Sequence, residues 1–112
     1  MKKVDPKFSY YMELRWPSVY DEFLEYAQKH GFEYQIGPGF FCHIIIVSSQ
    51  TRSFEIYRYS GTEVVNLFLT DAPYDFALHH SRKRPKWNIE LNLENFEEHL
   101  LAAKKWLLEN GQ

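Results

Sequence analysis

The sequence concentrates positive charge in one short segment that runs from His79 to Trp87. Four of the 13 Lys and Arg residues of the chain lie between Arg82 and Lys86. An arginine can bind a phosphate through two parallel hydrogen bonds, and a neighbouring indole can stack on a base. A solvated loop that keeps a sheet edge unpaired would have the same composition. The residues predicted to bind an anion or a nucleic acid are Arg82, Lys83, Arg84, Lys86 and Trp87.

Three residues with metal-binding side chains, Asp71, Asp75 and His79, follow one another at four-residue intervals. On a helix over 72–80 they would share one face and hold a divalent metal or act as a general acid–base set. Otherwise Asp71 is a cap, Asp75 a surface charge and His79 a part of the basic loop. These residues support the hypothesis of a small metal-dependent hydrolase or nuclease, which ranks last of three functional hypotheses. No residue is assigned as a metal ligand.

The eight tyrosines of the chain suggest a surface for another protein. Alternation of apolar and polar residues places one tyrosine on the polar side of a strand over 8–15, and two on the less apolar side of a strand over 53–59. A sheet face with exposed Tyr and Arg has the composition of a binding hot spot. The opposing interpretation is that tyrosine packs the core and its hydroxyl reaches water at the rim. The residues predicted to bind a protein are Tyr11, Tyr57, Arg58 and Tyr59.

Sequence motifs of common catalytic and cofactor sites are absent. The chain has no nucleophile elbow, P-loop, zinc-type cysteine pair or dinucleotide-binding fingerprint. Cys42 and His43 are adjacent in an apolar run, and neighbouring strand residues point to opposite faces, so they cannot act as a nucleophile and its base. We therefore predict a protein that is not an enzyme and has no cofactor.

Length and composition limit the remaining classes. The 112 residues, 45% hydrophobic and 18% aromatic, predict a single domain over 1–112 with an adequate core. A net charge of −2 gives no general attraction to nucleic acid or to anionic membranes. The lone cysteine and the absence of an apolar leader or a membrane-length apolar run predict a soluble, cytoplasmic protein that does not bind a membrane.

The elements that position these residues follow from periodicity and from turn signals. A helix over 18–30, with Pro17 or Ser18 at its start, is expected to end at Gly31. A last helix is expected to begin near Asn92 or Asn95, with Asn95 and Glu98 as a capping box, and to end at Gly111. The predicted strands, with turns at 37–39, 48–51 and 60–61, cover 8–15, 40–47, 53–59, 63–70 and 87–91. Residues 71–80 fit either a short helix or an irregular crossing.

The predicted fold class is α+β, an antiparallel β-meander of about five strands with two amphipathic helices packed on one face. The first functional hypothesis is a small non-catalytic module for protein–protein interaction, such as an inhibitor or a regulatory domain. The alternative is nucleic-acid or polyanion binding through residues 79–87. An exposed sheet edge also makes a homodimer plausible.

Overall fold

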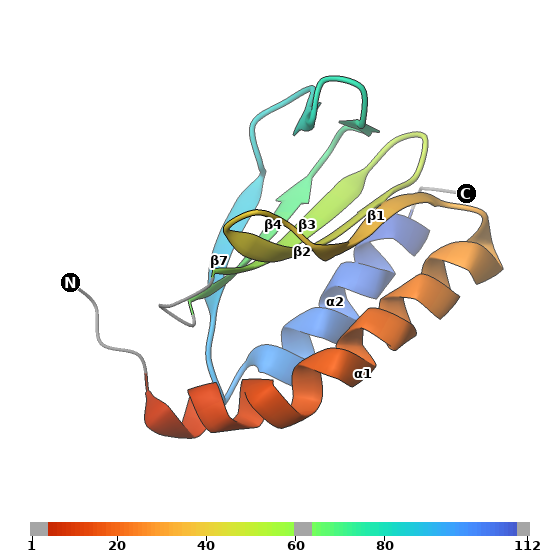
Figure 1. Cartoon of the computed structure of the whole chain (residues 1–112). Helices are drawn as coiled ribbons and strands as arrows, with labels where there is room; N and C mark the ends of the chain where they lie inside the picture. Colours follow the sequence, from red (N-terminus) through yellow and green to blue (C-terminus); the bar gives the residue numbers. More distant parts are fainter. Residues whose placement is uncertain (1–4, 60–63, 110–112) are drawn as a thin grey trace.

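Two helices lie on one face of a five-stranded antiparallel sheet in the computed structural model, which describes residues 5–59 and 64–109 (Figure 1). The strand order is β1-β2-β3-β4-β7, so that strands adjacent in sequence pair with one another except where β5 and β6 intervene. The predicted α+β meander with two helices is confirmed. The elements are α1 (Pro6–His30), β1 (Glu33–Pro38), β2 (Cys42–Ser48), β3 (Ser53–Tyr59), β4 (Val65–Thr70), β5 (Tyr74–Asp75), β6 (His80–Ser81), β7 (Trp87–Leu91) and α2 (Phe96–Leu108).

The predicted strand over 8–15 is wrong, because α1 already begins at Pro6 and runs through that segment. Phe8, Met12 and Trp16 recur at four-residue spacing and are buried, which is the pattern of a helix that packs one side against a core. Pro17 stands inside this helix instead of at its start. Because proline lacks an N–H group, it removes one helical hydrogen bond, and Figure 1 shows α1 curving along its length.

The C-terminal end of α1 agrees with the prediction. Gly31 adopts the left-handed conformation, with φ of 70°, and the N–H of Phe32 donates to the carbonyl of Ala27 at 2.9 Å. Glycine takes this conformation without a steric penalty, which explains why the helix ends there. The chain then reverses directly into β1.

Strand β1 is absent from the predicted strands, and the turn that follows it lies later than predicted. Gly37 and Pro38 belong to β1, and the tight turn is closed by the N–H of Gly39, which donates to the carbonyl of Cys42 at 2.6 Å. Phe40 and Phe41 therefore occupy the tip of the β1–β2 hairpin. The prediction that a strand begins at Phe40 is wrong, because β2 begins at Cys42.

The other strands follow the sequence pattern closely. Strands β3 and β7 have the predicted bounds, and β4 lies within its predicted range. A turn held by the Ser49 N–H and the Arg52 carbonyl, at 2.8 Å, joins β2 to β3. The predicted turn at 60–61 and the predicted helix end at Gly111 lie outside the described residues.

Helix α2 begins at Phe96, and its predicted capping box does not form. The Asn95 side chain makes no cap hydrogen bond to α2. The oxygen Oδ1 of Asn92 instead accepts hydrogen bonds from the backbone N–H groups of Glu94 and Asn95, both at 2.9 Å. The start of α2 is thus shaped by an Asn turn before the helix.

The hydrophobic core lies between the sheet and the helices. Helix α1 packs on β1 and β2, and α2 packs on β3 and β4. Tyr26 of α1 is tied to α2, because its hydroxyl donates to the Lys104 carbonyl at 2.6 Å. Within residues 5–59 and 64–109, no helix combines the length and apolarity that crossing a membrane requires. One face of the sheet packs against this core, and the opposite face points away from both helices.

Candidate functional site

The sheet face that points away from the helices, called here the outer face, follows from strand alternation. Ile45 and Val47 of β2 belong to the core with the helices, so Ile44 and Ile46 lie on the outer face. The strand register places the outer-face residues in rows across the sheet. One row holds Ser48, Ser53 and Thr70; the next holds Ile46, Glu55 and Phe68; the last two hold Ile44, Tyr57, Asn66, Cys42 and Tyr59.

One end of the outer face is covered by residues 71–81, called here the roof, which contain β5 and β6. The Ser53 hydroxyl donates to the Ala72 carbonyl at 2.8 Å, and the N–H of Tyr74 donates to Oγ of Ser48 at 2.9 Å. Glu55 is also hydrogen-bonded to Ser81. Figure 1 shows the two short strands standing over the sheet on the side away from the helices. The first row is buried as a result, and Ile46 retains only 2% of its exposure.

At the other end of the outer face no segment of the described part of the chain forms a comparable cover, and the residues there are half-buried. The rings of Tyr57 and Tyr59 are stacked with their centroids 6.1 Å apart, and Phe68 packs its edge against Tyr57 at 5.7 Å. The surface, called here the open face, consists of Cys42, Ile44, Tyr57, Tyr59, Asn66 and Phe68. None of these six residues carries a charge at neutral pH, and three of them are aromatic.

The hairpin tip formed by Phe40 and Phe41 extends this apolar surface beyond the sheet. Phe40 is 92% exposed and Phe41 is 74% exposed, and the two rings contact each other edge to face with centroids 4.6 Å apart. Cys42, the next residue, pairs with Tyr59 of the open face. Two adjacent exposed aromatic rings make the tip an apolar feature of the surface, and exposed apolar patches are a common mark of interaction sites.

Three titratable side chains of the outer face have raised pKa values. Burial under the roof raises the pKa of Glu55, whose carboxylate accepts a hydrogen bond from the Tyr57 hydroxyl at 2.6 Å. Burial also raises the pKa of Tyr59, and burial with the nearby Glu55 raises the pKa of Tyr57. Both tyrosines are therefore neutral at physiological pH and offer an apolar ring with a hydroxyl.

The structure brings together two of the four residues predicted to bind a protein. Tyr57 and Tyr59 share the open face, but Arg58 between them points to the helix side, because adjacent strand residues face opposite ways. Arg58 is buried there, with its guanidinium 3.4 Å from the Glu13 carboxylate. Tyr11 lies on α1 at the contact with α2, where its hydroxyl donates to Glu97.

The residues predicted to bind an anion lie at the end of the sheet opposite the Phe40–Phe41 tip. Residues 82–86, called here the basic loop, connect β6 to β7 and are exposed throughout. The loop is anchored by the N–H of Lys86, which donates to the Leu69 carbonyl at 2.7 Å. Trp87 then pairs with Leu69 at the start of β7. The structure therefore keeps the predicted anion-binding residues together in one surface segment.

The condition for the metal hypothesis is not met, because residues 71–80 form β5, a turn and the start of β6 instead of a helix. Asp71 pairs with Arg52 at 3.3 Å, and Oδ1 of Asp75 accepts hydrogen bonds from the N–H groups of Ala77 and Leu78. Among the described residues, no group of three His, Cys, Asp or Glu side chains is placed to hold a metal ion.

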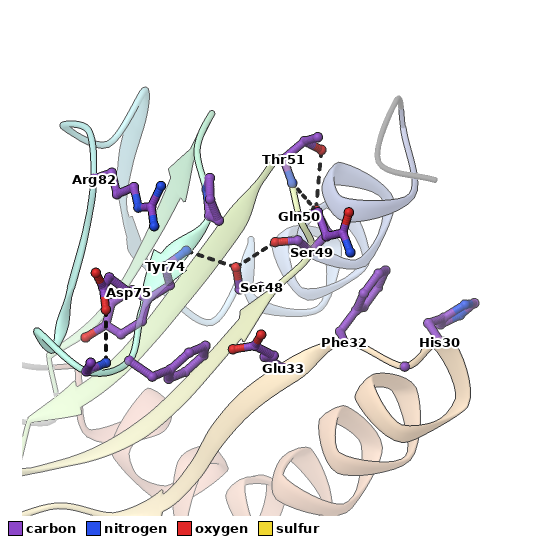
Figure 2. A pocket seen from close by; sticks show the side chains of 14 residues that line it. His30, Phe32, Glu33, Ser48, Ser49, Gln50, Thr51, Tyr74, Asp75 and Arg82 are labelled. Atoms are coloured by element: carbon purple, nitrogen blue, oxygen red, sulfur yellow. Dashed lines mark hydrogen bonds between the residues drawn. The ribbon is translucent and has the colours of Figure 1, made fainter.

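A groove of about 840 Å³ lies between the roof and the start of β1 (Figure 2). Figure 2 shows Asp75 and Arg82 on one wall and Glu33 on the other, with Ser48 between them. Hydroxyls and carboxylates at this groove largely serve the chain itself: Oγ of Ser48 binds the backbone of Tyr74, and Asp75 binds its own turn. The polar groups that line the groove thus stabilise loops of the chain itself, and the groove is a weaker candidate site than the open face.

Cys42 and His43 point to opposite faces of β2, in agreement with the prediction. His43 lies on the helix side, half-buried, with Nδ1 2.7 Å from the Tyr20 hydroxyl. Cys42 belongs to the open face, and burial raises the pKa of its thiol. A raised pKa disfavours the reactive thiolate, so Cys42 acts there as a small apolar residue.

Sequence reasoning did not identify the Phe40–Phe41 tip as a site, because the two aromatic residues were continuous with the apolar run of β2. The signal for the tip is Gly39. A side chain at Gly39 would place its Cβ 2.9 Å from the Cys42 carbonyl oxygen, so the tight turn needs glycine there. A glycine directly before two Phe residues thus marks a turn that exposes them.

Comparison of the chain with protein-family models, with curated proteins and with solved structures finds no match.

Proposed function

We propose that the chain is a non-catalytic protein-binding module whose docking surface is the open face together with the Phe40–Phe41 tip. The exposure of two adjacent phenylalanines at a hairpin tip is the observation that carries the proposal. Burying both rings in a partner would remove a large apolar area from water, and each fully buried Phe side chain contributes about 1.5–3 kcal/mol. An energetically dominant aromatic pair of this kind is typical of an interface hot spot.

The chemistry of this surface specifies the kind of partner. The six residues of the open face are uncharged, with Glu90 opposite Asn66 at the edge formed by β7, and Tyr57 and Tyr59 add neutral rings on the strands beside the protruding tip. Its complement is a partner protein with an apolar pocket that receives the tip and a neutral surface that covers the tyrosines. Basic residues that would draw the tip to anionic lipid headgroups are concentrated in the basic loop, at the far end of the sheet.

Site-specific photo-crosslinking tests this proposal in the cells that make the protein. A benzoylphenylalanine is placed at Phe41 or at Tyr59, and at Leu101 as a matched control, because Leu101 is a 54% exposed apolar residue on α2. We expect the first two positions to give adducts with the same partner protein, and Leu101 to give none with it.

Affinity for the captured partner is then measured with purified protein. The double variant Phe40→Ser/Phe41→Ser is expected to weaken binding at least tenfold while its melting temperature stays near that of the wild type. The control variant Leu14→Ser/Leu101→Ser, also at exposed apolar sites, keeps the affinity. Adducts only between copies of this chain, adducts only with lipid, or the same adducts from Leu101 would each contradict the proposal.

A further inference from the structure

The side chains of the basic loop have no acidic partner within residues 5–59 and 64–109. Arg82, Lys83, Arg84 and Lys86 are all exposed, and among the described residues no carboxylate forms an ion pair with any of them. Of the two aspartates that precede the loop in the sequence, Asp71 pairs with Arg52 and Asp75 binds its own turn. Four unneutralised cations within five residues repel one another, and an anionic ligand relieves that repulsion.

Trp87 supplies an aromatic surface directly beside these cations. Its indole is 45% exposed, whereas Trp16 and Trp106 are 2% and 6% exposed. The chain contains three tryptophans in all, so Trp87 is its one substantially exposed indole. The ammonium of Lys86 lies 5.1 Å from the centre of the Trp87 ring, which joins a cation to the aromatic surface.

A row of alternating aromatic and cationic groups holds Trp87 in place. Trp87 meets Trp106 edge to face, with ring centroids 5.1 Å apart, and the guanidinium of Arg52 lies 3.7 Å from the centre of Trp106. Arg52 is itself fixed, because it donates to the carbonyl of Trp106 at 3.1 Å and to that of Glu109 at 3.2 Å. The indole is therefore positioned before any ligand arrives, which lowers the entropy cost of binding.

We propose that the basic loop and Trp87 bind single-stranded nucleic acid, with phosphates on the four cations and one base stacked on the Trp87 indole. Stacking distinguishes this ligand from an acidic peptide, whose carboxylates would use the cations but leave the indole without a role. The site lies at the opposite end of the sheet from the open face, so it is independent of the proposed protein-binding surface. The net charge of −2 means that binding must come from this local cluster.

Fluorescence anisotropy with a labelled twelve-nucleotide oligothymidylate tests the proposal on the full chain. If four phosphates are neutralised, affinity should fall roughly 50-fold between 50 and 200 mM salt. Saturating oligonucleotide should quench the fluorescence of Trp87 in the wild type, since the other two tryptophans are buried. Trp87→Ala should weaken binding at least about fivefold, and Trp87→Phe should restore part of the loss because a phenyl ring also stacks.

Charge reversal provides the matched control. Arg82→Glu/Arg84→Glu should abolish binding, whereas Lys7→Glu/Lys105→Glu, with the same change of net charge at exposed helical positions, should retain it. The proposal is overturned if the control loses binding equally, if Trp87→Ala binds like the wild type, or if no salt-sensitive binding occurs. Equal affinity and equal quenching with an oligoglutamate peptide would also overturn it, in favour of an acidic protein ligand.

Discussion

Glu55 and Tyr57, two residues apart on the outer face of β3, are joined by a hydrogen bond of 2.6 Å from the tyrosine hydroxyl to the carboxylate. The pair lies where the roof ends and the open face begins. Glu55 also binds Ser81 of the roof, so one buried carboxylate connects the cover of the sheet to an aromatic residue of the proposed docking surface.

Replacing Glu55 by Gln should stabilise the protein at neutral pH. Burial raises the pKa of Glu55 in the folded state above its unfolded value near 4.5, so wild-type stability is lost as pH rises through the folded-state pKa. Glutamine keeps an acceptor for Tyr57 without the buried charge. Thermal melts should show Glu55→Gln above the wild type at pH 7.5 and equal to it near pH 4. Glu33→Gln, which removes the same charge at an exposed site of β1, is the control. The argument is contradicted if Glu55→Gln melts at a lower temperature than the wild type at pH 7.5.

Glu97 should respond to pH in the opposite direction. Hydrogen bonds from Arg15, at 2.8 and 2.9 Å, lower the pKa of Glu97, so its contribution is present above pH 4.5 and is lost as pH falls through the folded-state pKa. Glu97→Gln should therefore destabilise the protein at pH 7 but make little difference at pH 2. The half-exposed carboxylate limits the effect to about 1 kcal/mol or less. Urea denaturation at both pH values measures the difference in unfolding free energy between the wild type and Glu97→Gln. If this difference were the same at pH 7 and pH 2, the assigned role would be contradicted.

The sequence pattern predicts strands β2, β3, β4 and β7 better than it predicts the first helix, for a physical reason. Residues 8–16 contain two apolar periods at once. Phe8, Met12 and Trp16 recur at helical spacing, while Tyr10 and Leu14 complete an alternation typical of a strand. The structure buries the first set and leaves Tyr10 and Leu14 exposed, so the helical period is the one that packs. The choice between the helical period and the strand-like alternation depends on which side of the segment packs against the core, and the local sequence does not specify that side.

Prediction of the candidate site is limited in the same way. The alternation of β3 correctly puts Tyr57 and Tyr59 on one face, and the same rule excludes Arg58 from it, although the composition argument grouped the three. Tyr11 could not be placed without knowing that its segment is helical. Whether the outer face is covered depends on residues 71–81, whose sequence has no periodicity that predicts a roof.

Trp106 should be one of the most important residues of α2 for stability. Its Nε1 lies 3.1 Å from the Ser53 carbonyl oxygen and 3.3 Å from that of Thr70, so a single indole N–H is shared between β3 and β4. Trp106→Phe removes this donor and part of the buried ring, at a cost of about 2 kcal/mol. Urea denaturation measures the loss. Leu101→Ala, on the exposed side of the same helix, should stay within about 0.5 kcal/mol; equal losses would contradict the role of the indole.

Gly39→Ala should disturb the hairpin tip. The added Cβ would lie 2.9 Å from the backbone oxygen of Cys42, an atom that cannot move away as a side chain can. We expect a loss of about 1–3 kcal/mol, as for other overpacked sites. Gln50→Ala, in the exposed turn between β2 and β3, is the control and should be nearly neutral. If the protein is a protein-binding module, Gly39→Ala should also weaken partner binding, because Phe40 and Phe41 shift with the turn.

The order of elements along the chain has a consequence for biosynthesis. Helix α2 packs on β3 and β4, yet it follows every strand in the sequence. While the ribosome still holds the residues of α2, the inner side of β4, including Leu67, has no cover from that helix. The nascent chain therefore passes through a stage in which a nearly complete sheet exposes apolar side chains to solvent or to a chaperone, and this side of the core forms only when α2 emerges.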